Sequence, residues 1–578
     1  IDVRKLLLYM KGFGKECVLG PLFKLLEATF ELLVPLVVAN IVDKGIANGD
    51  TPYIIKMCLV MVLLGVVGLA SSVTAQYFSA RAAVGFASRL RHAVMQQTLR
   101  LGYGEIDRLG TSTLVARMPS DINQVQNGVN LTLRLLLRSP FVVFGAMVMA
   151  FTIDTQAALV FAGVIPILCI VVFGIMLITM PMYKRVQQRL DGVTGKARQN
   201  LSGVRVLRAF NMEKSQIQGF DDSTAALTAS QMSAGWVSGL LNPLTFVIVN
   251  LAVIVLIRVG AVKVDGGVLT QGLVIALYNY MSQILVELIK FANLILNITR
   301  SIASGSRIGQ LLEQEPSLSA PDAMPQPVDT NEAVSFHHVT FRCPGAEVPT
   351  LSDIDFTAKR GQTIGIIGGT GSGKTMLANL IGRFYDVDEG SVAVNGIDVR
   401  DYPLAALRAR LGLVPQKALL FSGTIRDNLR WGNAQASDED LWQALQDAQA
   451  DQVVRGKQGG LDAEVEPGGR NFSGGQRQRL TIARALVRRP ELLILDDSAS
   501  ALDFATDAAL RKALSKLPWK PTVVLISQRV SSIRHADKIV VLDDGHMAGL
   551  GTHTQLQQTC PVYQEICRSQ EKGEASAS

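Results

Sequence analysis

The chain has 578 residues, of which 48% are hydrophobic and only 18% are charged, and its mean hydropathy is +0.27. Soluble proteins carry about 25% charged residues, so this composition excludes a disordered chain, a small disulfide scaffold and an ordinary soluble enzyme. The formal net charge of +7 raises the question of nucleic-acid binding, which the positions of the basic residues must answer.

The first half of the chain contains six segments that are long and apolar enough to cross a membrane, for which about 20 residues are needed. Four of them contain no charged residue and cover residues 57–80, 155–183, 223–257 and 266–286. The uncharged stretch 139–153, extended back through 131–137, gives a fifth span, and 18–42 gives the sixth. An even number of spans places both ends of this block on the same side of the membrane.

The basic residues follow the positive-inside rule. Segments 81–138 and 182–236 each contain eight Lys or Arg residues. The loops expected on the opposite side, around 43–55, 154 and 258–265, contain only Lys44, Arg258 and Lys263. The basic excess therefore reflects membrane topology, and we expect no nucleic-acid partner.

The two basic segments are predicted to continue the membrane helices into the cytoplasm, because apolar and polar residues recur in them at helical spacing with few helix breakers. Short reversals near 102–110 and 199–208 place a turn at the tip of each extension.

Three charged residues in the span 18–42 need an explanation, because charge inside a membrane is costly and often functional. Lys24, Glu27 and Glu31 recur at spacings of three and four residues, which place them on one face of a helix. One interpretation is structural: Lys24 neutralises Glu27 near the inner interface and leaves Glu31 alone near mid-membrane. The other is that Glu31, together with Glu27, faces a water-filled cavity and favours a cationic substrate.

The second half of the chain has a different character, since the apolar pattern stops near residue 311 and a proline-containing stretch follows. Short β-rich runs then alternate with helical patterns, which is typical of an α/β domain. We expect a membrane domain at 1–315, a linker at 316–331, a nucleotide-binding domain at 332–570 and a flexible tail at 571–578.

A glycine-rich motif follows the strand predicted at 363–367. It consists of Gly368, Gly369, Thr370, Gly371, Ser372, Gly373, Lys374 and Thr375, and it fits the pattern G-x-x-x-x-G-K-[ST] between a strand and a helix. The backbone N–H groups of such a loop close around phosphate oxygens at a helix N-terminus. Lys374 would neutralise the β- and γ-phosphates, and the Thr375 hydroxyl would ligate Mg²⁺.

A second anchor for Mg²⁺ is predicted at Asp496, which ends the apolar strand 492–495. A carboxylate at the end of a buried strand is by itself weak evidence for a metal ligand. After a phosphate-binding loop earlier in the chain, however, it is the expected second ligand of Mg²⁺.

Further motif residues accompany these two anchors, and they are Gln416, Ser473, Gly474, Gly475, Gln476 and Asp503. With the glycine-rich loop and Asp496 they resemble the ATP-binding cassette of ABC transporters, and Ser-Gly-Gly-Gln is the most specific element. Fused after six spans, the cassette makes residues 17–568 resemble a half-transporter of the ABC exporter type. We therefore expect a membrane all-α domain of six transmembrane helices with long cytoplasmic extensions, followed by an α/β P-loop ATP-binding cassette.

The resemblance implies ATP and Mg²⁺ as cofactors, with Thr375, Gln416 and Asp496 around the metal ion. It also implies a dimer, because in this family the P-loop of one cassette faces the signature of another. Ser473 and the two glycines after it would reach the γ-phosphate of nucleotide held by the partner, and Asp503 matches the loop that communicates across the dimer. The two cytoplasmic turns would be coupling helices.

Several positions depart from the family's usual pattern. Asp497 stands where the family usually has the Glu that polarises the attacking water, and its carboxylate is retracted by about 1 Å, a displacement that can cost about 10²-fold in rate. Gln528 replaces a His and carries no proton switch near neutral pH. Cys343 replaces the aromatic residue that commonly stacks on adenine, so that either adenine binding is weaker or Phe341 takes over this role.

These departures fall on the catalytic half of one site and leave the signature intact, which resembles the degenerate subunit of heterodimeric bacterial multidrug ABC exporters. The resemblance implies a partner half-transporter with intact Glu and His. It also implies a place in the lipid of the inner or plasma membrane, with both termini and the nucleotide-binding domain in the cytoplasm. Amphipathic drugs or lipid-like small molecules would leave the cytoplasm or inner leaflet. The alternatives are a homodimeric exporter of lipid or peptide, an exporter-shaped importer, and a nucleotide-gated regulator or channel subunit.

Overall fold

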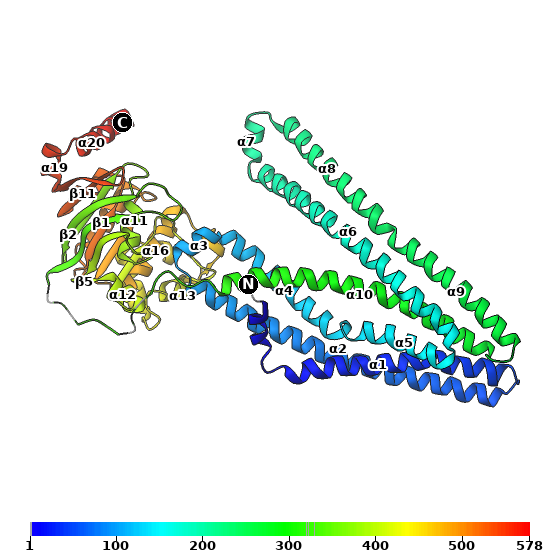
Figure 1. The fold of residues 1–578 in the computed structure, drawn as a ribbon. Coiled ribbons are helices and arrows are strands. Elements are labelled where there is room, and N and C mark those ends of the chain that lie inside the picture. The colour runs from blue at the N-terminus through cyan, green and yellow to red at the C-terminus, as the bar shows by residue number, and fades with distance from the viewer. Residues whose placement is uncertain (1–2, 320, 322, 327, 329, 578) are drawn as a thin grey trace. The chain divides into compact units, whose positions relative to one another are not determined.

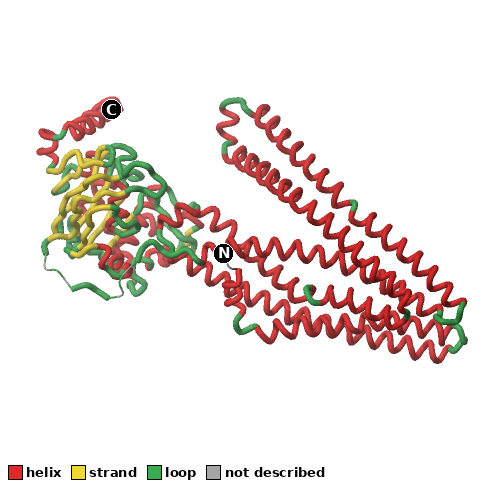
Figure 2. Tube along the Cα trace, viewed as in Figure 1, coloured by secondary structure: helices red, strands yellow, loops and turns green. Residues whose placement is uncertain are grey.

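The computed structural model describes residues 3–319, 321, 323–326, 328 and 330–577. The chain divides into two compact units, of which the first comprises Ile1–Leu99 and Ser112–Gln314 and the second comprises Arg100–Thr111 and Glu315–Ser578. The described residues of the first unit form helices joined by short turns, whereas the strands belong to the second unit (Figure 2).

Within the described part of the first unit, six helical stretches are long and apolar enough to cross a membrane. They are Gly14–Ile46, Thr51–Arg100, Pro119–Ile153, Thr155–Ser202, Glu213–Asp265 and Gln271–Leu312. The first five contain the predicted spans in full, and the sixth contains residues 271–286 of the span predicted at 266–286, whose first five residues form a turn. The prediction of a six-helix membrane domain is confirmed. Their lengths exceed the roughly 20 residues that a bilayer needs, as expected for helices that extend beyond it.

These stretches and two further short helices, η1 and α7, follow one another with short connections (Figure 1). They are η1 (Val3–Met10), α1 (Gly14–Asn40) with its π-helical continuation η2 (Ile41–Ile46), α2 (Thr51–Arg100), α4 (Thr111–Leu135), α5 (Arg138–Ile153), α6 (Thr155–Ser202), α7 (Val204–Ala209), α8 (Glu213–Gly239), α9 (Leu241–Asp265) and α10 (Gln271–Leu312). The short helix α7 lies at the far end of the hairpin that α6 and α8 form (Figure 1).

One predicted loop is wrong in position. The loop expected around 258–265 is helical, because α9 continues through Asp265 and the turn occupies 266–270. Lys263 stays in the helix, where its ammonium group pairs with the Asp154 carboxylate, so that its charge is compensated. Gly267, with a φ of 72°, then supplies the left-handed residue that the turn needs.

Small residues allow the membrane helices to approach each other closely, as is common between helices in lipid. Ala28 of α1, Ala146 of α5 and Ala276 of α10 are completely buried in one apolar cluster. A Cβ on Gly272 would lie 2.4 Å from the Ala39 carbonyl oxygen, and one on Gly145 would lie 2.5 Å from Leu32 Cδ1. The contacts of α10 with α1, and of α5 with α1, therefore depend on glycine.

The second unit is built around a six-stranded sheet with the order β12-β11-β3-β10-β9-β6, in which β12 alone is antiparallel. A four-stranded sheet, β2-β1-β4-β5, and a pair, β7-β8, accompany it. The strands are β1 (Glu332–Phe341), β2 (Leu351–Lys359), β3 (Thr363–Gly368), β4 (Glu389–Val394), β5 (Ile397–Asp398), β6 (Leu411–Val414), β7 (Gly423–Thr424), β8 (Glu464–Val465), β9 (Leu492–Asp496), β10 (Thr522–Ile526), β11 (Lys538–Asp543) and β12 (His546–Gly551).

Helices surround these sheets, and the short helix from the first predicted turn belongs to this unit. The helices are α3 (Tyr103–Leu109), α11 (Lys374–Ile381), η3 (Val399–Asp401), α12 (Leu404–Ala409), α13 (Ile425–Arg430), α14 (Asp438–Asp447), α15 (Asp451–Arg455), η4 (Gly460–Asp462), η5 (Pro467–Gly469), α16 (Gly474–Val487), α17 (Phe504–Leu514), α18 (Val530–Ile533), α19 (His553–Thr559) and α20 (Pro561–Ala577). The expectation of an α/β domain after the membrane helices is confirmed.

The boundary segments lie partly outside the described residues. In the predicted linker 316–331, residues 320, 322, 327 and 329 are not described, and the flanking elements end at Leu312 and begin at Glu332. Helix α20 runs through most of the predicted tail 571–578, of which residue 578 is not described.

The parallel strands bring distant parts of the sequence to one edge of the six-stranded sheet. In the register of β9 and β10, Asp496 pairs with Ile526, and β3 ends beside them at Gly368. All five residues of β9 are buried, which its apolar sequence explains, because both faces of a parallel sheet are covered. Ligands of open α/β sheets bind outside this carboxyl edge.

Candidate functional site

The loop between β3 and α11 has a conformation that requires glycine. Gly371 and Gly373 have φ values of 85° and 91°, which belong to the left-handed region. A Cβ on Gly373 would also lie 2.6 Å from Leu351 Cδ2. The predicted strand, glycine-rich loop and helix therefore follow each other in the order that a phosphate-binding loop needs.

Lys374 is the first residue of α11, and its side chain folds back over this loop. Its ammonium group donates hydrogen bonds to the carbonyl oxygens of Gly368 at 2.9 Å and Gly369 at 2.5 Å. Only 9% of the residue is exposed, and this burial lowers the pKa of Lys374, although Asp497 and Asp496 oppose the effect. A buried ammonium held by neutral carbonyl groups gains from a polyanion placed beside it.

A cavity of about 270 Å³ lies at this edge of the sheet. Its lining residues are Thr350, Thr370, Gly371, Gly373, Lys374, Thr375, Met376, Gln416, Asp496, Asp497, Ile526 and Gln528. The fold thus gathers the predicted glycine-rich loop, Gln416, both aspartates and Gln528 around one space, although they come from four separate parts of the sequence.

Three of these residues form an oxygen-rich corner suited to Mg²⁺. Thr375 Oγ1 donates to Asp496 Oδ1 at 3.2 Å, and Gln416 lines the same cavity. Burial raises the pKa of the Asp496 carboxyl. Carboxylate, hydroxyl and amide oxygens are the ligands that Mg²⁺ uses beside phosphate groups, so Thr375, Gln416 and Asp496 fit the predicted metal site.

Asp497 and Gln416 interact directly beside this corner. Gln416 Nε2 donates to Asp497 Oδ2 at 3.4 Å, and the Asp497 N–H donates to the Ile526 carbonyl oxygen at 2.9 Å. The φ of Asp497 is 46°, an uncommon value for a residue with a side chain. Burial raises the pKa of the Asp497 carboxyl. Gln528 completes this side of the cavity.

The signature residues occupy a different place in the same unit, and among the described residues none of them lines the 270 Å³ cavity. Ser473 caps α16, with the Gln476 N–H donating to Ser473 Oγ at 3.3 Å and the Ser473 N–H donating to Gln476 Oε1 at 3.0 Å. A Cβ on Gly475 would lie 2.9 Å from the Ala501 carbonyl oxygen. Asp503 caps α17 through the Thr506 N–H at 2.9 Å.

Arg529 is a residue that sequence reasoning missed. Its guanidinium donates to the carbonyl oxygens of Leu502 and Ser500, both at 3.2 Å, and it lies over the Phe504 ring at 5.2 Å. It therefore holds the loop before Asp503 close to the segment that carries Gln528. Its position directly after Gln528 was the only sequence signal available.

The residues around the predicted adenine position divide into two environments. Phe341 is 3% exposed and packs against Tyr385 with ring centroids 5.4 Å apart, so it belongs to the core and not to the cavity lining. The Cys343 N–H donates to Thr350 Oγ1 at 3.2 Å, and Thr350 lines the cavity. Cys343 therefore adjoins the cavity, and no aromatic residue lines it among the described residues.

Helix α3, at the first predicted cytoplasmic turn, packs on the α/β part of the second unit. The ring of Tyr103 lies 4.7 Å from that of Phe384 and 6.2 Å from that of Tyr385. The Tyr385 hydroxyl donates to Asp107 Oδ2 at 2.8 Å, and burial together with this carboxylate raises the pKa of Tyr385. This docking matches the role expected of a coupling helix.

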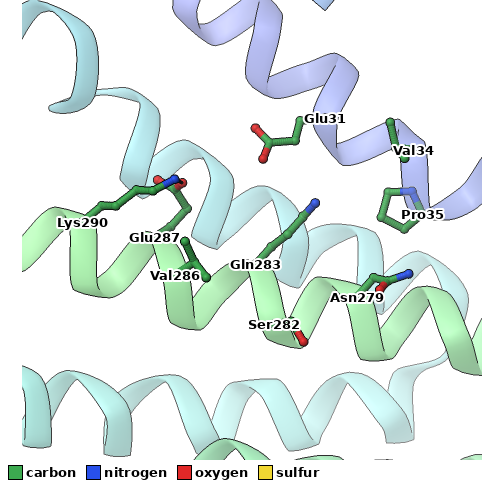
Figure 3. Close-up of a pocket in the computed structure, with 9 residues that line it drawn as sticks. All are labelled: Glu31, Val34, Pro35, Asn279, Ser282, Gln283, Val286, Glu287 and Lys290. Atoms are coloured by element: carbon green, nitrogen blue, oxygen red, sulfur yellow. Dashed lines mark hydrogen bonds and ion pairs between the residues drawn. The ribbon is translucent and has the colours of Figure 1, made fainter. Parts of the chain in front are cut away.

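A second cavity, of about 450 Å³, lies in the first unit between α1 and α10 (Figure 3). Its lining residues are Glu31, Val34, Pro35, Asn279, Ser282, Gln283, Val286, Glu287 and Lys290. Glu27 does not line it and instead accepts a hydrogen bond from Lys24 Nζ at 2.5 Å.

Glu31 is paired with a residue of another helix, because Arg138 Nη2 donates to Glu31 Oε2 at 2.6 Å. The partner comes from α5, 107 residues further along the chain, so helical spacing within α1 could not reveal it.

Replacing Asp496 by asparagine is expected to raise the melting temperature of the nucleotide-free protein at neutral pH. The rise should be about 2–4 °C for each kcal/mol by which the free energy of unfolding increases. Burial raises the pKa of Asp496 above that of the unfolded chain, so the folded state binds more protons and stability falls as pH rises through the raised value. The gain should therefore vanish as pH falls below about 4, and stabilisation by MgATP should be lost. Thermal scans of the full-length chain measure both effects.

The matched control is Asp440→Asn, at a half-buried capping residue whose hydrogen bonds with Ser437 lower its pKa. This change should lower the melting temperature. A nucleotide-free Asp496→Asn protein that melts below the unchanged chain would contradict the assignment of Asp496 as a destabilising buried carboxylate.

Comparisons with known proteins agree with this arrangement. The family model described as ABC transporter transmembrane region matches residues 17–288, and the model described as ABC transporter matches residues 351–500. An uncharacterized ABC transporter ATP-binding protein of Mycobacterium tuberculosis is 38% identical over 557 residues, which is 95% of each chain.

Two further relatives carry names that describe activities. A probable multidrug resistance ABC transporter ATP-binding/permease protein of Bacillus subtilis is 32% identical over 82% of this chain and 81% of its own length. An ATP-dependent lipid A-core flippase of Yersinia pestis is 29% identical over 94% of each chain.

Among solved structures, that of a bacterial Atm1-family ABC exporter with ATP bound has a TM-score of 0.80, covers 96% of this chain and 99% of its own, and is 23% identical in sequence. This likeness shows the fold. With six membrane helices before one α/β cassette, and with relatives that match along nearly the whole length, the chain belongs to the ABC transporter family and has the fold of an ABC exporter half-transporter.

Proposed function

We propose that this chain is one subunit of a heterodimeric, ATP-driven efflux transporter, and that its own ATP site hydrolyses slowly. The observation that carries the proposal is the pairing, in one cavity, of Asp497 and Gln528 at the positions where the family has its catalytic Glu and His. The signature segment, in contrast, keeps its usual residues and forms an ordered helix cap.

The chain's own site would hold nucleotide through the residues already described. Lys374 would exchange its bonds to the Gly368 and Gly369 carbonyl groups for phosphate oxygens. Thr375, Asp496 and Gln416 would hold Mg²⁺, which when bound neutralises charge on the β- and γ-phosphates. Binding is therefore expected to be intact, except that Cys343 offers no ring for the adenine.

Hydrolysis is expected to be slow for a geometric reason. The carboxylate of Asp497 is one methylene shorter than that of glutamate, and a displacement of about 1 Å can lower a rate about 10²-fold. Its contact with Gln416 also draws the carboxylate toward that side chain. The Gln528 amide donates a hydrogen bond but does not exchange a proton near neutral pH.

The intact signature indicates what the chain contributes to a partner. Ser473 and the N–H groups at the start of α16 are positioned at a helix N-terminus, which stabilises an anion. Because this group lies apart from the chain's own cavity, a second cassette must supply the nucleotide that it contacts. A partner with intact Glu and His would then contain the site that hydrolyses ATP faster.

The cargo is proposed to be an amphipathic drug or a lipid-like small molecule. Relatives named as a multidrug resistance transporter and as a lipid A-core flippase support this class. The basic residues at 81–138 and 182–236 support a cytoplasmic position for the cassette and both termini.

Restoring the family's residues at the impaired positions should accelerate this chain's own site. The double change Asp497→Glu with Gln528→His is expected to raise turnover about 10²-fold, because it returns the carboxylate by about 1 Å. The assay is ATP hydrolysis by the two-chain complex whose partner glutamate has been replaced by glutamine, which silences the other site. The control Asp438→Glu makes the same chemical change at a half-exposed residue outside the cavity, and no acceleration over this control would count against the impaired base.

The direct test of the function compares the chain purified alone with the chain co-expressed with a neighbouring half-transporter. We expect brisk ATP hydrolysis, and ATP-dependent uptake of a labelled amphiphile into inverted vesicles, only for the pair. Brisk turnover by the lone chain would favour the homodimer. Uptake of cargo into inverted vesicles corresponds to export from the cell, so its direction separates an exporter from an importer. Flux of cargo that continues without ATP hydrolysis would indicate a channel.

A further inference from the structure

Four charged residues from three helices form one connected cluster at the cavity between α1 and α10. Arg138 of α5 bridges two carboxylates, donating to Glu31 at 2.6 Å and to Glu287 at 2.6 Å. Glu287 also accepts from Ser139 Oγ at 3.0 Å and from Lys290 Nζ at 2.9 Å. The cluster contains two acids and two bases, so its formal charge is balanced.

The cluster lies within the depth of the bilayer. Glu31 is about 22 Å along its helix from Ile46, and Glu287 is about 24 Å along α10 from Gln271, at 1.5 Å per residue. These helix ends are neighbours, since the Gly272 N–H donates to Asp43 Oδ1 at 2.7 Å. Both distances are shorter than the roughly 30 Å hydrocarbon thickness, where an uncompensated charge is strongly disfavoured.

The cluster has a buried half and an open half. The side chains of Arg138 and Glu287 are only 6% and 3% exposed, and they compensate each other. Those of Glu31 and Lys290 are 39% and 47% exposed, and both line the cavity, one from each helix (Figure 3). Glu287 also lines the cavity, but its side chain is almost fully covered, so the exposed part of the cluster carries one acid and one base.

Both open residues have unused hydrogen-bonding capacity. A carboxylate accepts about four hydrogen bonds and an ammonium donates three, whereas the contacts above use one at Glu31 and one at Lys290. Gln283 lines the same cavity, and its Oε1 atom is buried without a hydrogen-bond partner among the described residues. Val34 and Val286 add apolar surface beside these polar groups.

We propose that this cavity recognises amphiphiles with a zwitterionic head, with Glu31 receiving the cationic group and Lys290 the anionic group. The inference rests on the proposed transport function and deepens it by naming the cargo class. It also replaces the expectation of a simple cationic substrate, because Arg138 already neutralises Glu31 in part. A cation alone would use only the remaining hydrogen-bonding capacity of Glu31, and an anion alone only that of Lys290, whereas a zwitterion uses both.

The test uses three fluorescent alkyl amphiphiles with the same tail and different heads: a sulfobetaine, a trimethylammonium and a sulfonate. Equilibrium binding is measured without ATP on the full-length two-chain complex in nanodiscs. The sulfobetaine is expected to bind about tenfold more tightly than either singly charged probe, one well-placed charge-assisted contact being worth about that factor. Equal affinity for the trimethylammonium probe and the sulfobetaine would overturn the proposal.

Two substitutions then give opposite changes of selectivity. Glu31→Gln leaves an excess positive charge, so the sulfobetaine should lose about tenfold in affinity while the sulfonate gains. Lys290→Gln leaves an excess negative charge, so the trimethylammonium probe should gain instead. A structural defect would weaken all three probes alike in either variant, and that outcome would also refute the proposal.

Matched controls remove the same charges elsewhere in the membrane unit. Glu16→Gln lies on the same helix as Glu31 and breaks a pair with Arg81, and Lys263→Gln breaks a pair with Asp154. Neither residue lines the cavity, so neither variant should change the order of the three affinities.

ATP-driven uptake of the same probes separates this proposal from the transport function. Transport of all three probes without selectivity would reject the zwitterion site and keep the exporter. Selective binding without ATP-driven transport would keep the site and reject the exporter. A fluorescent phosphatidylethanolamine, compared with the sulfobetaine, distinguishes a lipid source of the zwitterion from a small molecule.

Discussion

Replacing Lys374 by methionine is expected to lower the affinity of the chain for ATP by about 10²-fold. Methionine keeps the length and apolar character of the side chain but removes the charge, and hydrogen bonds to charged groups are worth about 1.5–3 kcal/mol. Lys374 is already directed over the loop by its bonds to Gly368 and Gly369, so little reorganisation precedes phosphate binding. Fluorescence polarisation of a labelled ATP on the full-length chain measures the affinity.

The control is Lys359→Met, at an exposed lysine that ends β2 outside the cavity. It should leave the affinity within twofold, because surface charges contribute little. An affinity that falls equally in both variants would show that the general charge of the unit, and not the position of Lys374, holds the nucleotide.

Replacing Ser473 by arginine should reduce ATP hydrolysis by the two-chain complex at least 10²-fold, whereas Asp497→Asn should reduce it less than twofold. Loss of a donor aimed at developing charge in a transition state costs about 10²–10³-fold, and Ser473 would serve the partner's faster site. Asp497 serves the slow site, whose loss barely changes the total. The measurement is steady-state phosphate release by the complex.

A matched substitution separates catalysis from helix capping. Ser437 caps α14 through the same reciprocal arrangement with the residue three positions later, Asp440, so Ser437→Arg removes an equivalent cap. Loss of a cap costs about 1 kcal/mol, and hydrolysis should survive in this variant. Equal loss in Ser473→Arg and Asp497→Asn would indicate two equivalent sites and contradict the division of labour.

Much of the nucleotide site could be predicted because its motifs are continuous in sequence. The strand, the glycine-rich loop and Lys374 follow each other directly, and Asp496 follows a strand that is buried throughout. Parallel strands place their carboxyl ends at one edge, so the meeting of these residues with Gln528 follows from the order of elements.

The contacts between helices could not be predicted in the same way. Arg138 reaches Glu31 across 107 residues and Glu287 across 149, and helical periodicity within one segment carries no information about such partners. The span 266–286 ends one residue before Glu287, so its uncharged sequence concealed the charge that the cluster needs. Arg529 was missed for a similar reason, since its partners are backbone carbonyl groups that any sequence would supply.

The most direct test of the division of labour asks which chain keeps its ATP intact. The two-chain complex is incubated with photoreactive ATP radiolabelled at the γ-phosphate, irradiated during turnover, and the chains are separated. We expect the γ-label on this chain, whose site retains uncleaved ATP, and its rapid loss from the partner, whose site releases phosphate. Loss of the γ-label from both chains at the same rate would contradict the account.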